Sequence, residues 1–114
     1  MARLSIRIDL APEGRIGPGK IALLEAIGRE GSISAAGRSL GMSYRRAWEL
    51  VDALNRLLGT PVVAAAAGGA RGGGASLTAA GRLLVEDYRA IERAAAEAAA
   101  ERLSALAGLG TPRG

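Results

Sequence analysis

The sequence predicts a mainly α-helical fold with one small β-hairpin. Three observations lead to this prediction. A helix-turn-helix pattern occupies residues 32–58, a glycine-rich segment lies between two short apolar runs within residues 61–77, and an alanine-rich helical pattern continues from residue 79 to about residue 106. We therefore expect a small helical head with a hairpin beside it, followed by one long helix.

The composition limits the kinds of site that the chain can hold. At 114 residues it fits one domain plus at most one extended element. With no Phe, one Trp and two Tyr, its core must be built from Leu, Ile, Val and Ala. The absence of Cys and His removes disulfides, thiolate or imidazole metal sites, Cys nucleophiles and the commonest general base. No acidic cluster suggests a carboxylate-only metal site, so we expect no cofactor and no enzymatic activity.

The formal net charge is +4, and its location is more informative than its size. Residues 1–81 hold ten Lys/Arg and six Asp/Glu, whereas residues 82–114 hold five of each. The basic excess therefore lies with the helix-turn-helix, as binding to phosphate would require. A net charge of +4 is by itself ordinary for a small soluble protein.

The N-terminus lacks the features of a targeting segment. Residues 1–10 mix Arg and Asp with apolar residues and contain no apolar core segment. No uninterrupted apolar run of about eighteen residues exists that could span a membrane. We therefore expect a cytoplasmic protein of a bacterium or archaeon, without membrane contact.

The first thirty residues predict a strand, a loop and a helix. Residues 4–9 alternate strictly between apolar and polar, which indicates a half-buried strand. Residues 11–18 hold two Pro and two Gly, which is typical of a loop. The helix predicted over residues 20–30 has one apolar face, formed by Ile21, Leu24 and Ile27 with Leu23 at its flank.

Two further helices follow at the spacing of a helix-turn-helix. Ser32 or Ser34 can cap the first of them by accepting hydrogen bonds from its free N–H groups. Its inward side is expected to carry Ala35, Ala36 and Leu40. The turn Gly41-Met42-Ser43 then precedes a helix over residues 44–58, whose inward stripe holds Ala47, Leu50, Val51, Leu54 and Leu58.

The start of the helix at residues 44–58 carries the strongest functional signal. Ser43-Tyr44-Arg45-Arg46 places two guanidinium groups at the N-terminal end of a helix, where a recognition helix contacts base edges and phosphates. The alternative is a solvated helix surface. An arginine that is bidentate to guanine contributes about 1–3 kcal/mol of discrimination, so this segment predicts binding to double-stranded DNA.

Five further residues are candidates for the same surface. We expect Ser34 to contact phosphate, whereas Lys20 and Thr78 are more simply explained as a surface charge and a helix cap. Contact of Tyr44 with phosphate or sugar is left open. Trp48 is expected to pack at the edge of the core rather than to face the DNA.

The glycine-rich segment predicts a β-hairpin. The apolar runs at residues 61–63 and 75–77 bracket Gly68–Gly74, and Arg71 lies at the tip. A Walker-type nucleotide loop is disfavoured because no Gly-Lys-Ser/Thr closes the segment. We expect a flexible tip that brings Arg71 to phosphates or the minor groove, with a mobile turn of no function as the alternative.

The last helix is expected to mediate dimerisation. Thr78 is its predicted N-cap, and the helix occupies most of residues 79–107, after a head at residues 1–78 and before a flexible tail at 108–114. Its apolar stripe has more surface than one small domain can cover, so a partner helix is expected. The stripe contains Leu84, Tyr88, Ile91 and Ala95, followed by Leu103 and Leu106.

Together these elements form a winged helix-turn-helix, and the sequence resembles the DNA-binding domain of the molybdate-responsive ModE regulators, which is related to the LysR-type domain. The resemblance spans most of residues 20–90, and its most specific part is Ser-Tyr-Arg-Arg-Ala-Trp followed by a glycine-rich wing. The matching stretches are Gly31-Ser32-Ile33-Ser34-Ala35-Ala36, Ser43-Tyr44-Arg45-Arg46-Ala47-Trp48, Asn55, Pro61-Val62-Val63, Gly68-Gly69, Gly72-Gly73-Gly74-Ala75 and Leu77-Thr78-Ala79-Ala80-Gly81. The resemblance implies a transcriptional regulator that binds an inverted repeat as a homodimer.

Two departures from the family pattern matter. ModE regulators carry C-terminal molybdate-binding domains, for which this sequence has no room, so it resembles the stand-alone form and leaves open whether molybdate or another effector is sensed. The family usually has a basic residue on the first wing strand, where this chain has Ala65. The rival hypothesis is a helix-turn-helix adaptor that binds a protein partner or a small oxyanion and has weak affinity for DNA.

Overall fold

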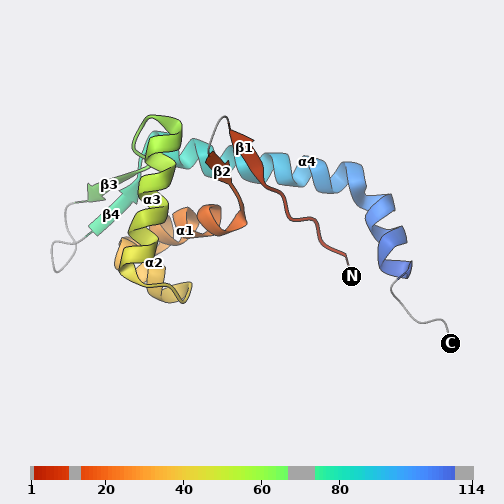
Figure 1. Ribbon diagram of the computed structural model, residues 1–114, viewed down its shortest axis with the longest axis horizontal. Coiled ribbons are helices and arrows are strands. Elements are labelled where there is room, and N and C mark those ends of the chain that lie inside the picture. The colour runs from red at the N-terminus through yellow and green to blue at the C-terminus, as the bar shows by residue number, and fades with distance from the viewer. Residues whose placement is uncertain (1, 11–13, 67–73, 110–114) are drawn as a thin grey trace.

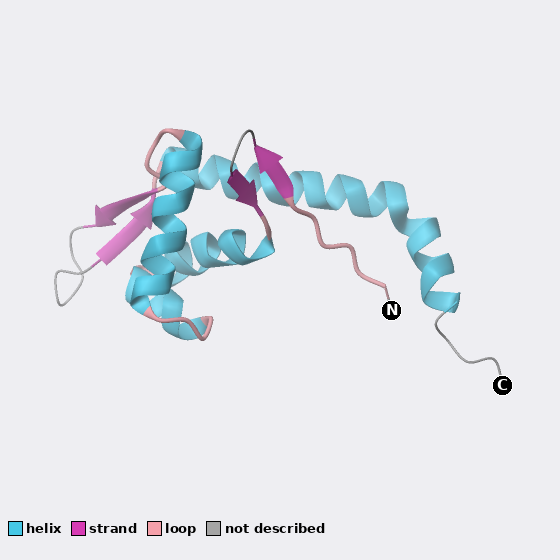
Figure 2. Ribbon diagram, in the orientation of Figure 1, coloured by secondary structure: helices cyan, strands magenta, loops and turns pink. Residues whose placement is uncertain are grey.

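The computed structural model describes residues 2–10, 14–66 and 74–109. Figure 1 traces the elements along the chain, and Figure 2 shows that most of them are helices. In chain order they are β1 Ile8–Leu10, β2 Gly14–Ile16, α1 Pro18–Glu30, α2 Ile33–Ser39, α3 Tyr44–Leu58, β3 Val63–Ala66, β4 Gly74–Leu77 and α4 Ala79–Leu109. The fold is therefore mainly α-helical, as predicted, with two small hairpins where the sequence predicted one.

The core is formed by α1, α2 and α3. The predicted apolar face of α1 is confirmed, since Ile21, Leu23, Leu24 and Ile27 are fully buried. Ala47, Val51 and Leu54 bury the inward stripe of α3, and Leu50 and Leu58 pack at its margin. The expected inward position of Leu40 is wrong: α2 ends at Ser39, so Leu40 no longer follows the helical repeat and is exposed.

Local capping chemistry sets the two helices of the helix-turn-helix. Of the two candidate caps for α2, Ser32 is the N-cap, and its Oγ accepts a hydrogen bond from the Ala35 N–H at 3.0 Å. Gly41 has a φ of 72°, a left-handed conformation that favours glycine and reverses the chain before α3. The predicted bounds of α3, residues 44–58, agree with the structure.

The N-terminal segment differs from the prediction. Half-buried and exposed residues alternate from Ala2 to Asp9 as expected, but only Ile8–Leu10 forms a strand. Its partner is β2, which pairs Ile8 with Ile16 and lies where a loop was predicted. Strand β2 was not predicted because its three residues, next to glycines, are too few to show an alternating pattern. The burial of Ile16 against the helical core holds this strand in place.

The wing is the antiparallel hairpin β3–β4, with Val63 opposite Leu77 and Ala66 opposite Gly74. Two hydrogen bonds attach it to the helices. The Oδ1 of Asn55 on α3 accepts from the Val62 N–H at 2.8 Å, and the Gly31 carbonyl accepts from the Ala75 N–H at 2.8 Å. The predicted tip, including Arg71 and Gly68, lies outside the described residues.

The long helix α4 starts at a cap that the sequence predicted. Thr78 Oγ1 accepts from the Gly81 N–H at 3.1 Å and donates to the Pro61 carbonyl at 2.7 Å. The helix continues to Leu109, beyond the expected end near residue 106. Its C-terminal half projects away from the three-helix core (Figure 1). No helix within the described ranges is long and apolar enough to cross a membrane.

Candidate nucleic-acid interface

The N-terminal corner of α3 is exposed. Tyr44 and Trp48 have relative exposures of 58% and 49%. Ser43 is the N-cap, and its Oγ accepts a hydrogen bond from the Arg46 N–H at 3.0 Å. That bond caps the first turn of the helix, in which Arg45 and Arg46 are both exposed.

Arg45 and Arg46 differ in their surroundings. Nε of Arg45 lies 3.5 Å from Oε2 of Glu49, one turn further along α3, and the Arg45 side chain is 89% exposed. Such a pair in water contributes only about 0.3–0.5 kcal/mol, so a phosphate or base can replace it at little cost. The Arg46 guanidinium has neither a hydrogen bond nor an ion pair to any described residue. Both side chains are therefore available to an external anion.

A groove of about 390 Å³ separates α3 from the wing. Tyr44, Trp48 and Asn55 line it on the α3 side, and Ala64 and Ala65 on the wing side. The expectation that Trp48 packs at the core edge is wrong, because the alanines of β3 are too small to cover an indole. The groove is consequently walled by aromatic rings on one side and by backbone and small side chains on the other.

Ser34, near the start of α2, lines the same groove. Its Oγ accepts a hydrogen bond from Nη1 of Arg38 at 3.0 Å. This contact holds a guanidinium beside the hydroxyl, which adds positive charge at the place where Ser34 was expected to meet phosphate. The fold therefore brings Ser34 together with Tyr44 and Trp48.

A second hollow, of about 650 Å³, lies on the other side of α3 and is rich in basic residues. We call it the basic hollow; its charged lining residues are Arg7, Arg15, Lys20, Arg46 and Glu49. Nζ of Lys20 donates to the Arg15 carbonyl at 2.8 Å. Burial lowers the pKa of Lys20, and the nearby positive charges of Arg15 and Arg46 lower it further.

Sequence reasoning missed this cluster. Lys20 was explained as an ordinary surface charge, and Arg15 fell in a predicted loop. The available signal was the basic excess of residues 1–81, which the helix-turn-helix alone does not account for.

The residues expected at the dimer seam divide into two groups. Tyr88 is 1% exposed and its hydroxyl donates to the Ile6 carbonyl at 2.7 Å, so its assignment to the seam is corrected: its ring belongs to the core of a single chain. Leu84 is half-buried against the same core. Ile91 is 48% exposed, and Ala95 is half-buried.

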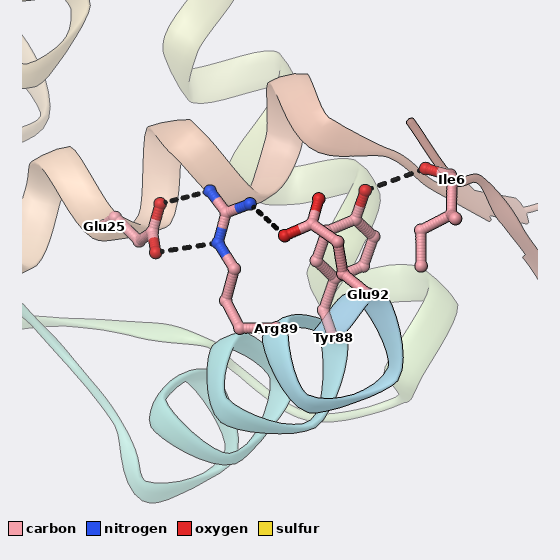
Figure 3. Close-up of polar contacts among 5 residues, drawn as sticks. All are labelled: Ile6, Glu25, Tyr88, Arg89 and Glu92. Carbon is pink, nitrogen blue, oxygen red and sulfur yellow. Dashed lines mark hydrogen bonds and ion pairs between the residues drawn. The ribbon is translucent and has the colours of Figure 1, made fainter. Parts of the chain in front are cut away.

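Beside Tyr88, an ion-pair network ties α4 to α1 (Figure 3). Arg89 donates to Glu25 from Nη2 at 2.7 Å and from Nε at 3.0 Å, and to Glu92 from Nη1 at 2.8 Å. The hydrogen bonds from Arg89 hold the pKa of Glu25 below its usual range, and the same bonds raise the pKa of Arg89. The network joins α4 to α1 of the three-helix core.

The described ranges contain no group of three or more His, Cys, Asp or Glu residues that could hold a metal ion. All buried side chains of these ranges are apolar apart from the Tyr88 hydroxyl, and none is charged. The chemistry available on the surface is therefore that of cations, hydroxyls and aromatic rings.

A three-helix core, a β-hairpin wing and an exposed, arginine-bearing start of α3 define a winged helix-turn-helix domain. Residues 19–82 match the family described as "Bacterial regulatory helix-turn-helix protein, lysR family". The match covers more than half of the chain, which belongs to this family.

Two relatives show where the similarity is strongest. The molybdenum-pterin-binding protein MopB of Rhodobacter capsulatus is 57% identical over 83 residues, which cover 73% of this chain and 31% of that protein. The molybdenum transport protein ModE of Azotobacter vinelandii is 40% identical over 111 residues, or 95% of this chain and 40% of that protein. The chain thus spans well under half the length of both relatives, and the resemblance to ModE regulators is confirmed for this region.

Among solved structures, the fold is similar to the crystal structure of the CbnR_DBD–DNA complex. The TM-score is 0.60 at 25% sequence identity, and the match covers 77% of this chain and 95% of that chain. Full-length CbnR complexed with its target DNA gives a TM-score of 0.56 at 26% identity.

Proposed function

We propose that this chain is a DNA-binding transcriptional regulator that recognises its operator with the N-terminal end of α3. The observation that carries the proposal is the pair Arg45 and Arg46, which lie exposed at a capped helix start without a structural partner of consequence. A helix of this kind fits the major groove with its first residues against base edges. The relation to lysR-family regulators, and the structural likeness to a protein in complex with DNA, support the same assignment.

In this arrangement the two sides of α3 have separate roles. Arg45 and Arg46 enter the major groove of the DNA, and Ser34 and Ser43 contact its sugar-phosphate backbone. The wing, with Arg71, contacts the flanking backbone. Tyr44 and Trp48 line the groove between α3 and the wing, where a deoxyribose or a thymine methyl group could pack. Regulation by DNA binding requires no catalytic group, and it would place the protein with the bacterial chromosome in the cytoplasm.

The test is a titration of duplex DNA with three variants. Arg45→Ala and Arg46→Ala should each weaken binding to the preferred sequence by about tenfold, since a bidentate contact contributes about 1–3 kcal/mol. Arg56→Ala is the matched control: it removes the same charge from the same helix, about 16 Å further along. Equal effects of all three variants, or no effect of any, would contradict the assignment.

We further propose that the regulator is a two-fold dimer joined through α4. The face of α4 that covers the core at Leu84 and Tyr88 continues as Ala95, Leu103 and Leu106 where the helix projects beyond the core (Figure 1). Ile91 and Leu106 are 48% and 60% exposed there. A second α4 would cover this face and hold two recognition helices about 34 Å apart, which matches an inverted repeat.

Sedimentation analysis tests the dimer. The wild-type chain should sediment as a dimer at micromolar concentration, and Ile91→Glu should shift it to monomer. Ala90→Glu, at the neighbouring exposed residue about 100° around the helix from Ile91, should leave the dimer intact. A wild-type monomer at high micromolar concentration would contradict this proposal.

The rival function, an adaptor that binds a protein or a small oxyanion, draws on one observation: the described wing strands carry no charged side chain. The two functions differ in their response to salt. Affinity for DNA should fall steeply as salt rises because phosphate contacts release counterions, whereas binding to a protein partner through an apolar face should not.

A further inference from the structure

The basic hollow holds more positive charge than its structural role explains. Arg7 pairs with Asp9 at 3.2 Å, and Glu49 already faces Arg45 at 3.5 Å. The remaining cations of the hollow, Arg15, Lys20 and Arg46, form no ion pair with a carboxylate of the described residues. Among the described residues, these three cations are thus held together by the fold without an ion-pair partner, and Glu49 is the one carboxylate that lines the hollow with them.

These cations come from three different elements. Arg15 is on β2, Lys20 is in the first turn of α1, and Arg46 is in the first turn of α3. Lys20 is the central one, because both arginines lie close enough to lower its pKa. An anion placed among the three would relieve this mutual repulsion.

The hollow and the wing lie on opposite flanks of the recognition helix. The groove beside the wing is lined by Tyr44, Trp48 and Asn55, whereas Arg46, Leu50 and Ala53 line the basic hollow. Positions two residues apart on a helix point about 200° apart, so the two sets face opposite ways. Figure 1 shows the same arrangement at the level of elements, with β3–β4 on one side of α3 and β1–β2 on the other.

A helix that occupies the major groove has a phosphate backbone on each flank, because the groove is about 12 Å wide and a helix with its side chains nearly fills it. On one flank the wing strands Val63–Ala66 and Gly74–Leu77 offer no charged side chain. The opposite flank offers Arg15 and Lys20 beside Arg46. The charge distribution therefore fits a backbone contact on the flank away from the wing.

We propose that the basic hollow, formed by the β1–β2 hairpin and the starts of α1 and α3, binds the phosphate backbone of the operator on the side of α3 opposite the wing. The hairpin then acts as a second, N-terminal wing. This inference rests on the proposed DNA-binding function. It adds a contact with the DNA phosphate backbone that neither the recognition helix nor the β3–β4 wing supplies. Arg15 and Lys20 would contribute affinity and counterion release, but no sequence preference.

The test compares two double variants that lose the same charge. Arg15→Gln with Lys20→Gln removes two cations of the hollow, and Arg93→Gln with Arg102→Gln removes two exposed cations of α4. The affinity of each for the selected operator and for an unrelated duplex is measured across a range of salt concentrations. The assembly state of every variant is checked by sedimentation, so that a loss of dimer is not mistaken for a loss of contact.

The hollow variant should lose affinity on both duplexes alike, by about tenfold per half-site at 0.1 M salt, and its salt slope should fall by about 0.9 for each lost phosphate contact. The control variant should keep the wild-type slope. If the wild-type chain binds the operator specifically and the hollow variant keeps its slope and affinity, the second-wing proposal is overturned while the proposed function stands. Absence of specific binding by the wild-type chain would instead defeat the proposed function itself.

A second experiment distinguishes DNA from a small anion as the ligand of the basic hollow. Inorganic phosphate is titrated into wild type and hollow variant while the amide resonances of residues 14–20 are followed by NMR. If phosphate binds the wild-type hollow in the submillimolar range and the double variant loses that site with no change in DNA affinity, the hollow is a small-anion site and the proposal fails. Weak, non-saturating shifts together with the loss of salt slope support it.

Discussion

The guanidinium of Arg89 on α4 and the carboxylate of Glu25 on α1 meet in a two-point ion pair, at 2.7 and 3.0 Å, although the residues are 64 positions apart in the chain. Glu92 accepts a third hydrogen bond from the same guanidinium (Figure 3). The pair joins α1, in the proposed DNA-binding head, to α4, the proposed dimer helix, and so contributes to the angle between them. In a dimer, that angle determines the spacing of the two recognition helices.

Loss of the pair should cost stability. Glu25→Ala leaves Arg89 with one carboxylate partner, and we expect the free energy of unfolding in urea to fall by about 1 kcal/mol, since both side chains are about one-third exposed and solvent screens part of the interaction. Glu30→Ala is the control, because its pair with Arg29 is at the surface and at 3.6 Å. Equal losses for the two variants would show that the Arg89 pair is no stronger than a surface contact.

The same carboxylate should make stability depend on pH in the acid range. The pKa of Glu25 is lower in the folded chain than in the unfolded chain, so the stabilisation is fully present above the unfolded value and is lost as pH falls through the folded value. Below about pH 5 the unfolding free energy of wild type should therefore decrease more steeply than that of Glu25→Gln. Parallel curves from urea melts between pH 3 and 7 would contradict the assigned shift.

The N-terminal arm should depend on the Tyr88 hydroxyl. Tyr88→Phe removes the hydrogen bond to the Ile6 carbonyl and leaves that acceptor without its buried donor, which should cost about 1–2 kcal/mol. Hydrogen exchange of residues 6–10 should accelerate in the variant. Tyr44→Phe, the same change at the chain's other tyrosine, should leave stability unaltered because Tyr44 is exposed. An unchanged exchange rate in Tyr88→Phe would mean that the arm is held by its apolar contacts alone.

The start of α4 should accept no side chain at Gly81. A Cβ there would overlap the carbonyl oxygen of Val62, which is backbone and cannot swing away. We expect Gly81→Ala to lower the unfolding free energy by about 1–3 kcal/mol, measured by thermal or urea unfolding. Gly108→Ala, in open space on the same helix, should be neutral or slightly stabilising because alanine favours helix. Stabilisation by both changes would mean that the contact between α4 and the wing is looser than described.

The wing should gain affinity from a basic residue. Ala65 is exposed on β3 and lines the groove beside α3, so Ala65→Arg would add a cation where the flanking backbone is proposed to pass. At fixed salt we expect binding to any duplex to tighten several-fold, with a steeper salt slope. Ala90→Arg on α4 adds the same charge away from the DNA and should have little effect. No difference between the two would place the backbone away from β3.

The parts of this fold that were predictable from sequence are those that short-range chemistry determines. The bounds of α3 follow from the turn that ends at Ser43 and from the apolar repeat, and the start of α4 follows from Thr78. Tyr88 was wrongly assigned to the dimer seam. An apolar stripe on a helix has the same sequence pattern whether it packs against its own core or against a partner chain. The burial of Tyr88 and its contact with Ile6, 82 residues away, distinguish these alternatives.

The candidate site was predicted in part for the same reason. Arg45 and Arg46 could be identified from the sequence because they directly follow the turn. The basic hollow could not, because its residues come from β2, α1 and α3 and no local sequence pattern connects them. Trp48 was predicted to pack at the core edge because a lone tryptophan is usually covered by neighbouring side chains. The alanines of β3 do not cover it. Sequence periodicity gives the direction of a side chain on its helix but not the size of the residues opposite it.

The most direct measurement is selection of bound sequences from random duplex DNA by the wild-type chain, followed by titration of the selected duplex with wild type and Arg46→Ala at two salt concentrations. The account predicts enrichment of an inverted repeat, affinity that falls steeply with salt, and about tenfold weaker binding by the variant. No enrichment, with equally weak binding of wild type and variant to every duplex, would contradict the claim that α3 reads DNA.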